Sequence, residues 1–205
     1  AVRPTSIMGA SKRLSELIVQ AYATKNESAT TYSIVRFGNV LGSSGSVINK
    51  FNDQIDQGNY VTVTHPEVTR FFMTVQESVN LIIHASLMAK GGEIFLLDMG
   101  KPLKIIDVAK KMIELRGLKV FDNISGSGDI ATKIIGLKPG EKLYEELLID
   151  GDAKISNNPN IFYGKDSHIE FPKLRKLIDE LQSIVNENDL MKVRKFLKDK
   201  TDLKI

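Results

Sequence analysis

The feature that most constrains the fold is the apolar run Ile94-Phe95-Leu96-Leu97, inside a segment that extends from Glu93 to Asp98. A strand with one solvated face alternates apolar and polar residues, whereas a continuous apolar run is typical of a strand buried on both faces, often in a parallel sheet. Helical periodicity precedes this run at 75–89 and follows it at 105–115. Strands that alternate with helices predict the α/β class.

The same alternation continues along the chain. Thr5 or Ser6 can cap the first helix, and Thr74 with Glu77 forms a capping box for the helix that begins at 75. The further predicted elements are a helix at 7–24, a strand at 30–36, a helix at 47–57, a strand at 60–64, a strand at 132–135, a short helix through 148, and two lysine-rich helices within 171–198.

Composition excludes several classes of protein. The 28 basic and 25 acidic side chains leave a net charge of +3 without a long block of one sign, so nothing predicts a nucleic-acid partner. Cysteine is absent and no histidine pair has metal-ligand spacing, so no metal site is expected. No apolar run reaches the roughly 18 residues that cross a bilayer, so we expect no membrane segment in this chain.

Three groups of residues could carry chemistry. Met8 and Lys12 share a helical face away from the apolar stripe, although a lysine in that position is usually only solvated. The loop 42–46, rich in Gly and Ser, opens a helix and could hold a phosphate, or could simply turn the chain. Arg70 lies among aromatic and apolar neighbours, where a guanidinium usually meets an anion or a carboxylate.

Four motifs in order resemble one family. They are Arg3-Pro4-Thr5-Ser6-Ile7-Met8-Gly9-Ala10-Ser11-Lys12-Arg13, Arg36-Phe37-Gly38-Asn39-Val40-Leu41-Gly42, His65-Pro66-Glu67-Val68-Thr69-Arg70-Phe71-Phe72-Met73, and the run 136–147 that contains Lys138-Pro139-Gly140-Glu141. Over about residues 1–150 the chain resembles the C-terminal part of the polysaccharide-biosynthesis (capsule type) UDP-N-acetylglucosamine 4,6-dehydratases, a branch of the extended short-chain dehydrogenase/reductases.

The resemblance implies roles on the cofactor side of a site. Lys12 matches the lysine that binds the nicotinamide ribose, and the backbone at Phe37, Gly38 and Val40 would lie near the nicotinamide. Met8 occupies the position of the superfamily's catalytic tyrosine. A thioether cannot exchange a proton, so Met8 can only shape the pocket. The cofactor of the complete protein would be NAD or NADP.

On the substrate side, the resemblance implies that Asn39 contacts the phosphates of a UDP-sugar and that Arg70 clamps the diphosphate. Lys138 and Glu141 match a second clamp, on phosphate and nucleotide ribose respectively. The family's acid/base groups lie largely in a Thr-Asp-Lys run before the segment that starts here, and the dinucleotide fingerprint belongs to the first half of a Rossmann fold. We therefore expect residues 1–205 alone to be inactive.

Two alternatives stay open: a non-catalytic module that binds a UDP-sugar or a partner chain, and a nucleotide-sugar epimerase. Met8 disfavours the tyrosine-dependent epimerases.

For domain organisation, we expect a region at 1–150 in which elements of a partial Rossmann fold are interleaved with those of a nucleotide-sugar-binding region. A C-terminal helical extension follows at 151–205. The predicted strand near 31–36 would have an unpaired edge, relieved by homo-oligomerisation or by an N-terminal half. The expected location is cytoplasmic, with the parent protein tethered to the membrane in some relatives.

Overall fold

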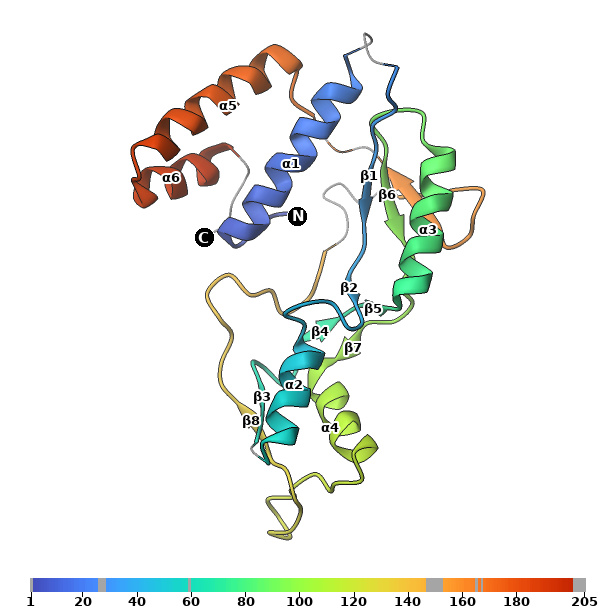
Figure 1. The fold of residues 1–205 in the computed structure, drawn as a ribbon, viewed down its shortest axis with the longest axis vertical. Coiled ribbons are helices and arrows are strands. Elements are labelled where there is room, and N and C mark those ends of the chain that lie inside the picture. Colours follow the sequence, from blue (N-terminus) through green and yellow to red (C-terminus); the bar gives the residue numbers. More distant parts are fainter. Residues whose placement is uncertain are drawn as a thin grey trace. The chain divides into compact units, whose positions relative to one another are not determined.

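The computed structural model describes residues 2–25, 29–58, 60–146, 153–164, 166 and 168–200. The chain forms two compact units. The first unit comprises Ala1–Phe37, Val79–Asp98 and Glu146–Ile205, and the second comprises Gly38–Ser78 and Met99–Glu145. Figure 1 labels the helices and strands of both units.

The first unit contains a four-stranded sheet in the order β1-β6-β10-β9. These strands are β1 (Ile34–Arg36), β6 (Ile94–Leu97), β10 (Ile161–Gly164) and β9 (Lys154–Ile155). β1 pairs with β6 in parallel, β10 pairs with β6 antiparallel, and all four residues of β6 are buried. The predicted α/β class and buried strand are therefore confirmed. β1 also lies at the end of the strand order, as the sequence predicts for an edge.

Helix α1 (Ile7–Ala23) lies between the sheet and a helical hairpin within the first unit. The Ser6 hydroxyl caps α1 by accepting from the Gly9 amide at 3.1 Å. Val19 packs against the strand residues Ile34, Ile94 and Leu96. On its other side, α1 contributes Ala10 and Leu14 to a core with α5 (Phe171–Asn186) and α6 (Leu190–Lys200). Burying both sides of α1 fixes it between two layers.

Four charged side chains connect three segments of the first unit, and of these Arg13, Arg36 and Asp166 are buried while Glu16 is partly buried. The Arg36 guanidinium on β1 donates to both carboxylate oxygens of Glu16 on α1, each at 2.8 Å, and to Asp166 Oδ2 at 2.6 Å. Arg13 Nη1 lies 3.1 Å from Glu16 and 3.5 Å from Asp166. Two guanidinium groups thus face two carboxylates, which compensates charges that would be costly to bury alone. We call these residues the charge network.

The second unit has its own core, built mainly by α2 (Val47–Asp56), α4 (Ile105–Leu115) and β3 (Val61–Val63). Phe51, Val61, Ala109 and Ile113 are fully or almost fully buried in it. β3 pairs in parallel with β8 (Thr132–Ile134). The other strands form two short pairs, β2 (Asn39–Val40) with β5 (Phe72–Met73) and β4 (Thr69–Arg70) with β7 (Leu103–Lys104).

Helix α3 (Val75–Met88) confirms the predicted capping box. The Thr74 amide donates to the Glu77 carboxylate at 2.7 Å, and the Glu77 amide donates to the Thr74 hydroxyl at 3.1 Å.

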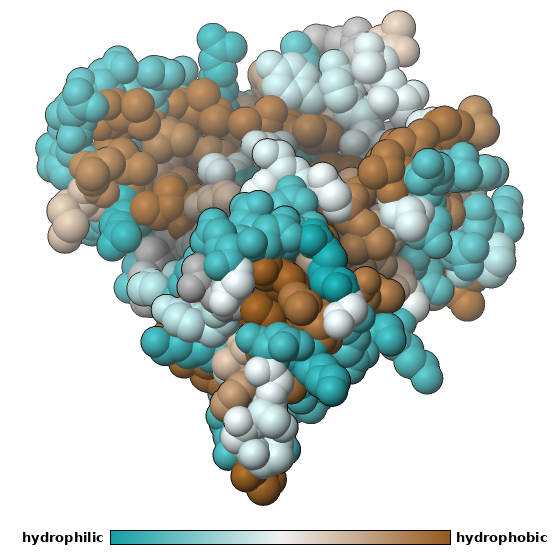
Figure 2. All heavy atoms as spheres, turned by 60° about the horizontal axis from the view of Figure 1, so that its bottom comes forward, coloured by the Kyte–Doolittle hydropathy of each residue, from teal (hydrophilic) through white to brown (hydrophobic). Residues whose placement is uncertain are grey.

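Val79, Ile83 and Leu87 recur at every fourth position of α3 and are exposed. Hydrophobic atoms reach the surface in several places in the space-filling view (Figure 2). No helix among the described residues is both long and apolar enough to span a membrane.

The prediction of a short helix through residue 148 is wrong for the described residues of this segment. Residues 141–146 are not helical, and 147–150 lie outside the described residues. The carbonyl oxygens of Lys142 and Leu143, which a helix would use internally, accept hydrogen bonds from Arg70 instead. In the segment predicted as a helical extension, β9 and β10 precede α5 and α6. The domain boundary at 150 stays a prediction.

Loss of the Glu16 charge should destabilise the first unit. Burial alone would raise the pKa of Glu16, but the hydrogen bonds and charge of Arg36, helped by Arg13, outweigh it and lower the pKa. The network's contribution is therefore complete above the unfolded pKa of about 4.3 and is lost as the pH falls through the lower folded value. We expect Glu16→Gln to cost about 3 kcal/mol at neutral pH, measured by urea unfolding, because both arginines lose a charged partner.

The exposed pair Lys111–Glu114 provides the control, since its Nζ–Oε2 distance of 3.4 Å joins solvated side chains. Lys111→Gln should change the unfolding free energy by less than about 0.5 kcal/mol. Equal effects of the two substitutions would contradict a stabilising role for the charge network.

Candidate functional site

The predicted residue Arg70 anchors an irregular segment of the second unit. Its Nη1 donates to the carbonyl oxygens of Thr69 at 2.7 Å and Leu143 at 3.4 Å, and its Nη2 donates to the Lys142 carbonyl at 2.8 Å. Its Nε lies 3.4 Å from Glu145 Oε1. Most of the donors of this guanidinium therefore already face acceptors in the chain. A phosphate at Arg70 would have to replace some of these contacts.

Glu141 lies beside Arg70 and is held by three groups. Its Oε1 accepts from the Thr64 hydroxyl at 2.7 Å and lies 3.7 Å from Arg70 Nη2. Its Oε2 accepts from the backbone amide of Lys138 at 3.0 Å. Three of the predicted substrate residues, namely Arg70, Lys138 and Glu141, thus come together although 68 or more residues separate the first from the others.

The ammonium groups of Lys50 and Lys138 are close enough to repel each other. Partial burial lowers the pKa of Lys50, and repulsion from the Lys138 ammonium lowers it further, against the opposing charge of Glu141. Lys50 belongs to the first half of α2, which follows the loop 42–46 and is capped by the Ser46 hydroxyl. Two neighbouring cations favour an anion between them, because its charge relieves their repulsion. Arg70, Lys138, Glu141 and Lys50 together are called the Arg70 cluster below.

The motif from Phe37 to Val40 continues from the first unit into the second, with the division after Phe37. Asn39 and Val40 form β2 and pair with Phe72 and Met73 of β5. The Asn39 amide donates to the Phe71 carbonyl at 2.9 Å, and its exposed side chain extends from the strand next to the segment that carries Arg70. Gly38 is tightly enclosed, since a Cβ there would lie 2.9 Å from the Phe71 carbonyl oxygen.

Met8 and Lys12 belong to the first unit, one turn apart on α1. Met8 is 67% exposed, and Lys12 is exposed as well. Within the described residues the Lys12 ammonium has no hydrogen bond or ion pair, so its charge is available to a ligand. The buried face of α1 carries the apolar residues Ala10, Leu14 and Leu17, so Lys12 lies away from the core, and its contact with a ribose stays a prediction.

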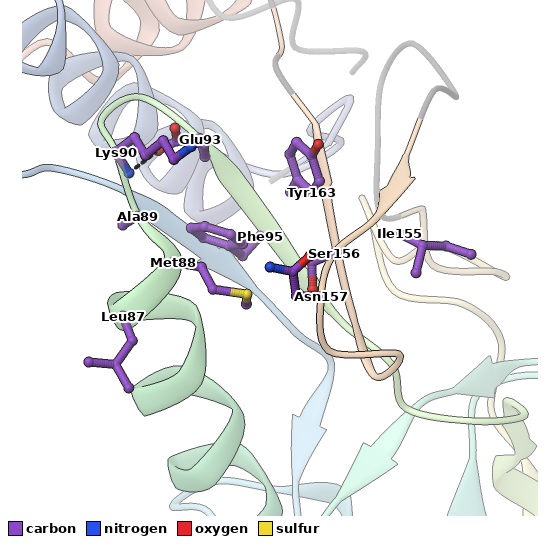
Figure 3. A pocket seen from close by; sticks show the side chains of 10 residues that line it. All are labelled: Leu87, Met88, Ala89, Lys90, Glu93, Phe95, Ile155, Ser156, Asn157 and Tyr163. Atoms are coloured by element: carbon purple, nitrogen blue, oxygen red, sulfur yellow. Dashed lines mark hydrogen bonds between the residues drawn. The ribbon is translucent and has the colours of Figure 1, made fainter.

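The first unit also contains an open cavity of about 480 Å³ between the end of α3 and β6, β9 and β10. Figure 3 shows the Phe95 and Tyr163 side chains on neighbouring strands, with Met88 and Asn157 nearby. Lys90 and Glu93 lie where the chain enters β6. None of the predicted site residues lines this cavity.

Comparison with known proteins decides the family. The model of the family described as "Polysaccharide biosynthesis protein" matches residues 1–165. The chain belongs to this family. The predicted family membership is therefore confirmed, and the match extends past the predicted limit of 150 to β10.

Individual relatives agree with this assignment. The capsular polysaccharide biosynthesis protein CapD of Staphylococcus aureus is 44% identical over 194 residues, which cover 94% of this chain and 31% of CapD. A UDP-glucose 4-epimerase of Rickettsia canadensis is 35% identical over 164 residues, which cover 80% of this chain and 45% of the epimerase. The chain thus spans less than half the length of these curated relatives.

A solved structure extends the comparison to the fold. The X-ray structure of Pen from Bacillus thuringiensis matches with a TM-score of 0.66 and 35% identity, over 88% of this chain and 59% of that one. Together with the parallel β1–β6 pair and the helices beside it, this likeness supports the predicted Rossmann-type α/β fold.

Sequence reasoning missed Lys50, Thr64 and Glu145. Lys50 and Thr64 are distant in sequence from Lys138 and Glu141, so no local motif could identify them. Glu145 belongs to the matched run 136–147 but was expected to lie on a helix. Their partners become visible only once the segment 138–145 is placed beside β3 and β4.

Arg70→Ala should loosen the segment 141–146. The substitution removes the Arg70 donors to the carbonyls of Lys142 and Leu143, at a cost of about 1–3 kcal/mol, and leaves the Leu143 carbonyl with the Thr69 amide. We expect faster amide hydrogen exchange there, measured by mass spectrometry, while the core around Phe51 keeps its protection. Arg116→Ala is the control, because Arg116 pairs with Asp56 at the surface of the same unit. Unchanged exchange at 141–146 would contradict the anchoring role.

Proposed function

We propose that this chain supplies substrate- and cofactor-binding residues of an NAD(P)-dependent nucleotide-sugar 4,6-dehydratase that acts on UDP-N-acetylglucosamine in the biosynthesis of surface polysaccharide. The observation that carries the proposal is the Arg70 cluster, in a chain of the polysaccharide biosynthesis family. A cluster with more cations than carboxylates suits a diphosphate, and a carboxylate beside it suits the hydroxyls of a ribose.

The residues of the Arg70 cluster would contact different parts of the UDP-sugar. Lys138 and Lys50 would hold phosphate oxygens through their ammonium groups. Arg70 would contribute the Nε and Nη2 donors that now face the carboxylates of Glu145 and Glu141. Glu141, oriented by Thr64 and by the Lys138 amide, would accept hydrogen bonds from ribose hydroxyls. Asn39 would add a side-chain amide from β2 to the phosphates.

The exposed ammonium of Lys12, which has no partner among the described residues, suits the ribose of a nicotinamide dinucleotide, with backbone contacts at Phe37, Gly38 and Val40. When bound, NAD or NADP supplies reversible hydride transfer, which allows a hexose to be oxidised at C4 before water leaves and reduced at C6 afterwards. Met8 has no exchangeable proton, so it can shape the pocket but cannot act as an acid or base. Proton transfer must therefore come from groups other than Met8.

An epimerase is the second candidate, supported by the 35% identity to a protein named UDP-glucose 4-epimerase. Met8 at the tyrosine position argues against an epimerase that depends on that residue. A binding module without chemistry is the third candidate, and it predicts affinity for a UDP-sugar that NAD or NADP does not change. For the whole protein we propose a cytoplasmic enzyme that is homo-oligomeric or associates with an N-terminal half.

Binding of UDP-N-acetylglucosamine to the full 205-residue chain, measured by isothermal titration calorimetry, tests the proposal. We expect Lys138→Ala to weaken binding about tenfold, or 1.4 kcal/mol, because one phosphate contact is lost. Lys138 is preferable to Arg70 for this test, because its ammonium has no hydrogen bond or ion pair within the described residues.

Lys119→Ala is the matched control, an exposed lysine of the same unit outside the Arg70 cluster. It should leave affinity unchanged. Equal affinity of the Lys138→Ala variant and the unmodified chain would rule out the assigned phosphate contact. In a second titration, NAD+ binding that Lys12→Ala does not weaken would overturn the cofactor role of Lys12.

A further inference from the structure

The positive charge of this chain is concentrated in one helix. Helix α6 carries five basic side chains and one acidic side chain, at positions 192, 194, 195, 198, 200 and 199. The rest of the chain carries 23 basic and 24 acidic side chains. The entire excess of positive charge therefore lies within the 11 residues of α6.

The cations of α6 line its solvent side. Val193, Phe196 and Leu197 face the core with α1 and α5. At about 100° per residue, Arg194, Lys195 and Lys198 lie on the opposite side of the helix, and all three are exposed. Within the part of the chain that the structure describes, none of these three forms an ion pair. Their charges are thus neither neutralised nor used to hold the fold.

Two large apolar side chains begin the same surface. Leu190 is 78% exposed and Met191 is 76% exposed, in the first turn of α6. Val185, near the end of α5, is exposed beside the turn that joins the two helices. Figure 1 shows α5 and α6 on the side of α1 away from the sheet, so this surface lies on the outside of the first unit.

We propose that α6 docks this unit on an anionic lipid bilayer. In this arrangement, Arg194, Lys195 and Lys198 contact lipid headgroups while Leu190 and Met191 insert into the boundary between headgroups and acyl chains. Charge complementarity and adjacent apolar anchors are the two contributions that hold peripheral segments at anionic membranes. Nucleic-acid phosphates would satisfy the cations but would leave the aliphatic side chains in water.

The apolar face of α6 is already buried against α1 and α5, so the helix keeps its place in the fold when it docks. Only the cationic side of α6 and its first turn therefore contact the membrane in this arrangement. Such a contact weakens with ionic strength, because salt screens exposed charges over about 10 Å at 0.1 M. This surface is separate from the Arg70 cluster, which belongs to the second unit.

Vesicle co-sedimentation of the full 205-residue chain tests this proposal, with phosphatidylcholine vesicles and with equimolar phosphatidylcholine and phosphatidylglycerol. We expect binding only to the anionic vesicles, and loss of binding at high salt. The triple variant Arg194→Gln, Lys195→Gln, Lys198→Gln should lower the partition coefficient roughly 100-fold, at about a factor of five for each basic residue. Leu190→Ser with Met191→Ser should lower it about tenfold.

Matched controls distinguish a specific effect of α6 from a general effect of removing positive charge or apolar side chains from the surface. Lys101→Gln, Lys110→Gln and Lys119→Gln remove three exposed lysines from the second unit, and Leu115→Ser with Ile124→Ser removes two of its exposed apolar side chains. Both controls should keep the vesicle binding of the unmodified chain. Circular dichroism melts of each variant verify that folding is intact.

Several results would overturn the proposal. They are absence of binding to the anionic vesicles, equal binding to neutral vesicles, and equal losses in the controls and the α6 variants. Full binding by the Leu190→Ser, Met191→Ser variant would also overturn it, because charge attraction alone fits any polyanion. Displacement of the chain from vesicles by a small excess of duplex DNA would assign the surface to nucleic acid instead.

Discussion

The first unit depends on a buried pairing of opposite charges. Arg36 joins Glu16 on α1 to Asp166 after β10, and Arg13 adds a second cation to the same carboxylates. An unpaired charge in this position would cost several kcal/mol, so the three segments stabilise one another. The helix that carries Lys12 is thereby fixed to the strand that precedes Asn39 in the chain. The charge network thus holds in place the two segments that carry the predicted cofactor-binding residues Lys12 and Phe37.

A comparable constraint organises the second unit. Arg70 holds the carbonyls of Lys142 and Leu143, which brings Lys138 and Glu141 beside β3 and β4. The arginine that the resemblance assigns to a diphosphate is therefore also a structural anchor. A substitution at Arg70 changes the loop as well as any phosphate contact, and for this reason Lys138 reports on ligand binding more directly.

Local sequence rules predicted the elements whose signals are local. The capping box of Thr74 and Glu77, the apolar run of β6 and the periodicity of α4 each lie within one segment, and the structure confirms all three. Two-residue strands such as β2 and β4 exist only because a partner strand lies beside them. The segment 141–146 is not helical because distant Arg70 takes its carbonyls. Lys50 joins the candidate site only through tertiary structure, so no motif reveals it.

The division of the chain into units has a consequence for the order of folding. The second unit is complete once residue 145 has left the ribosome, whereas the first needs the segments 1–37, 79–98 and 146–205. The Arg36–Asp166 contact closes a separation of 130 residues. Contacts this distant slow folding, because the entropy of closing a long loop is lost before they form. During synthesis, Arg13, Glu16 and Arg36 therefore leave the ribosome long before Asp166, the second carboxylate of the charge network.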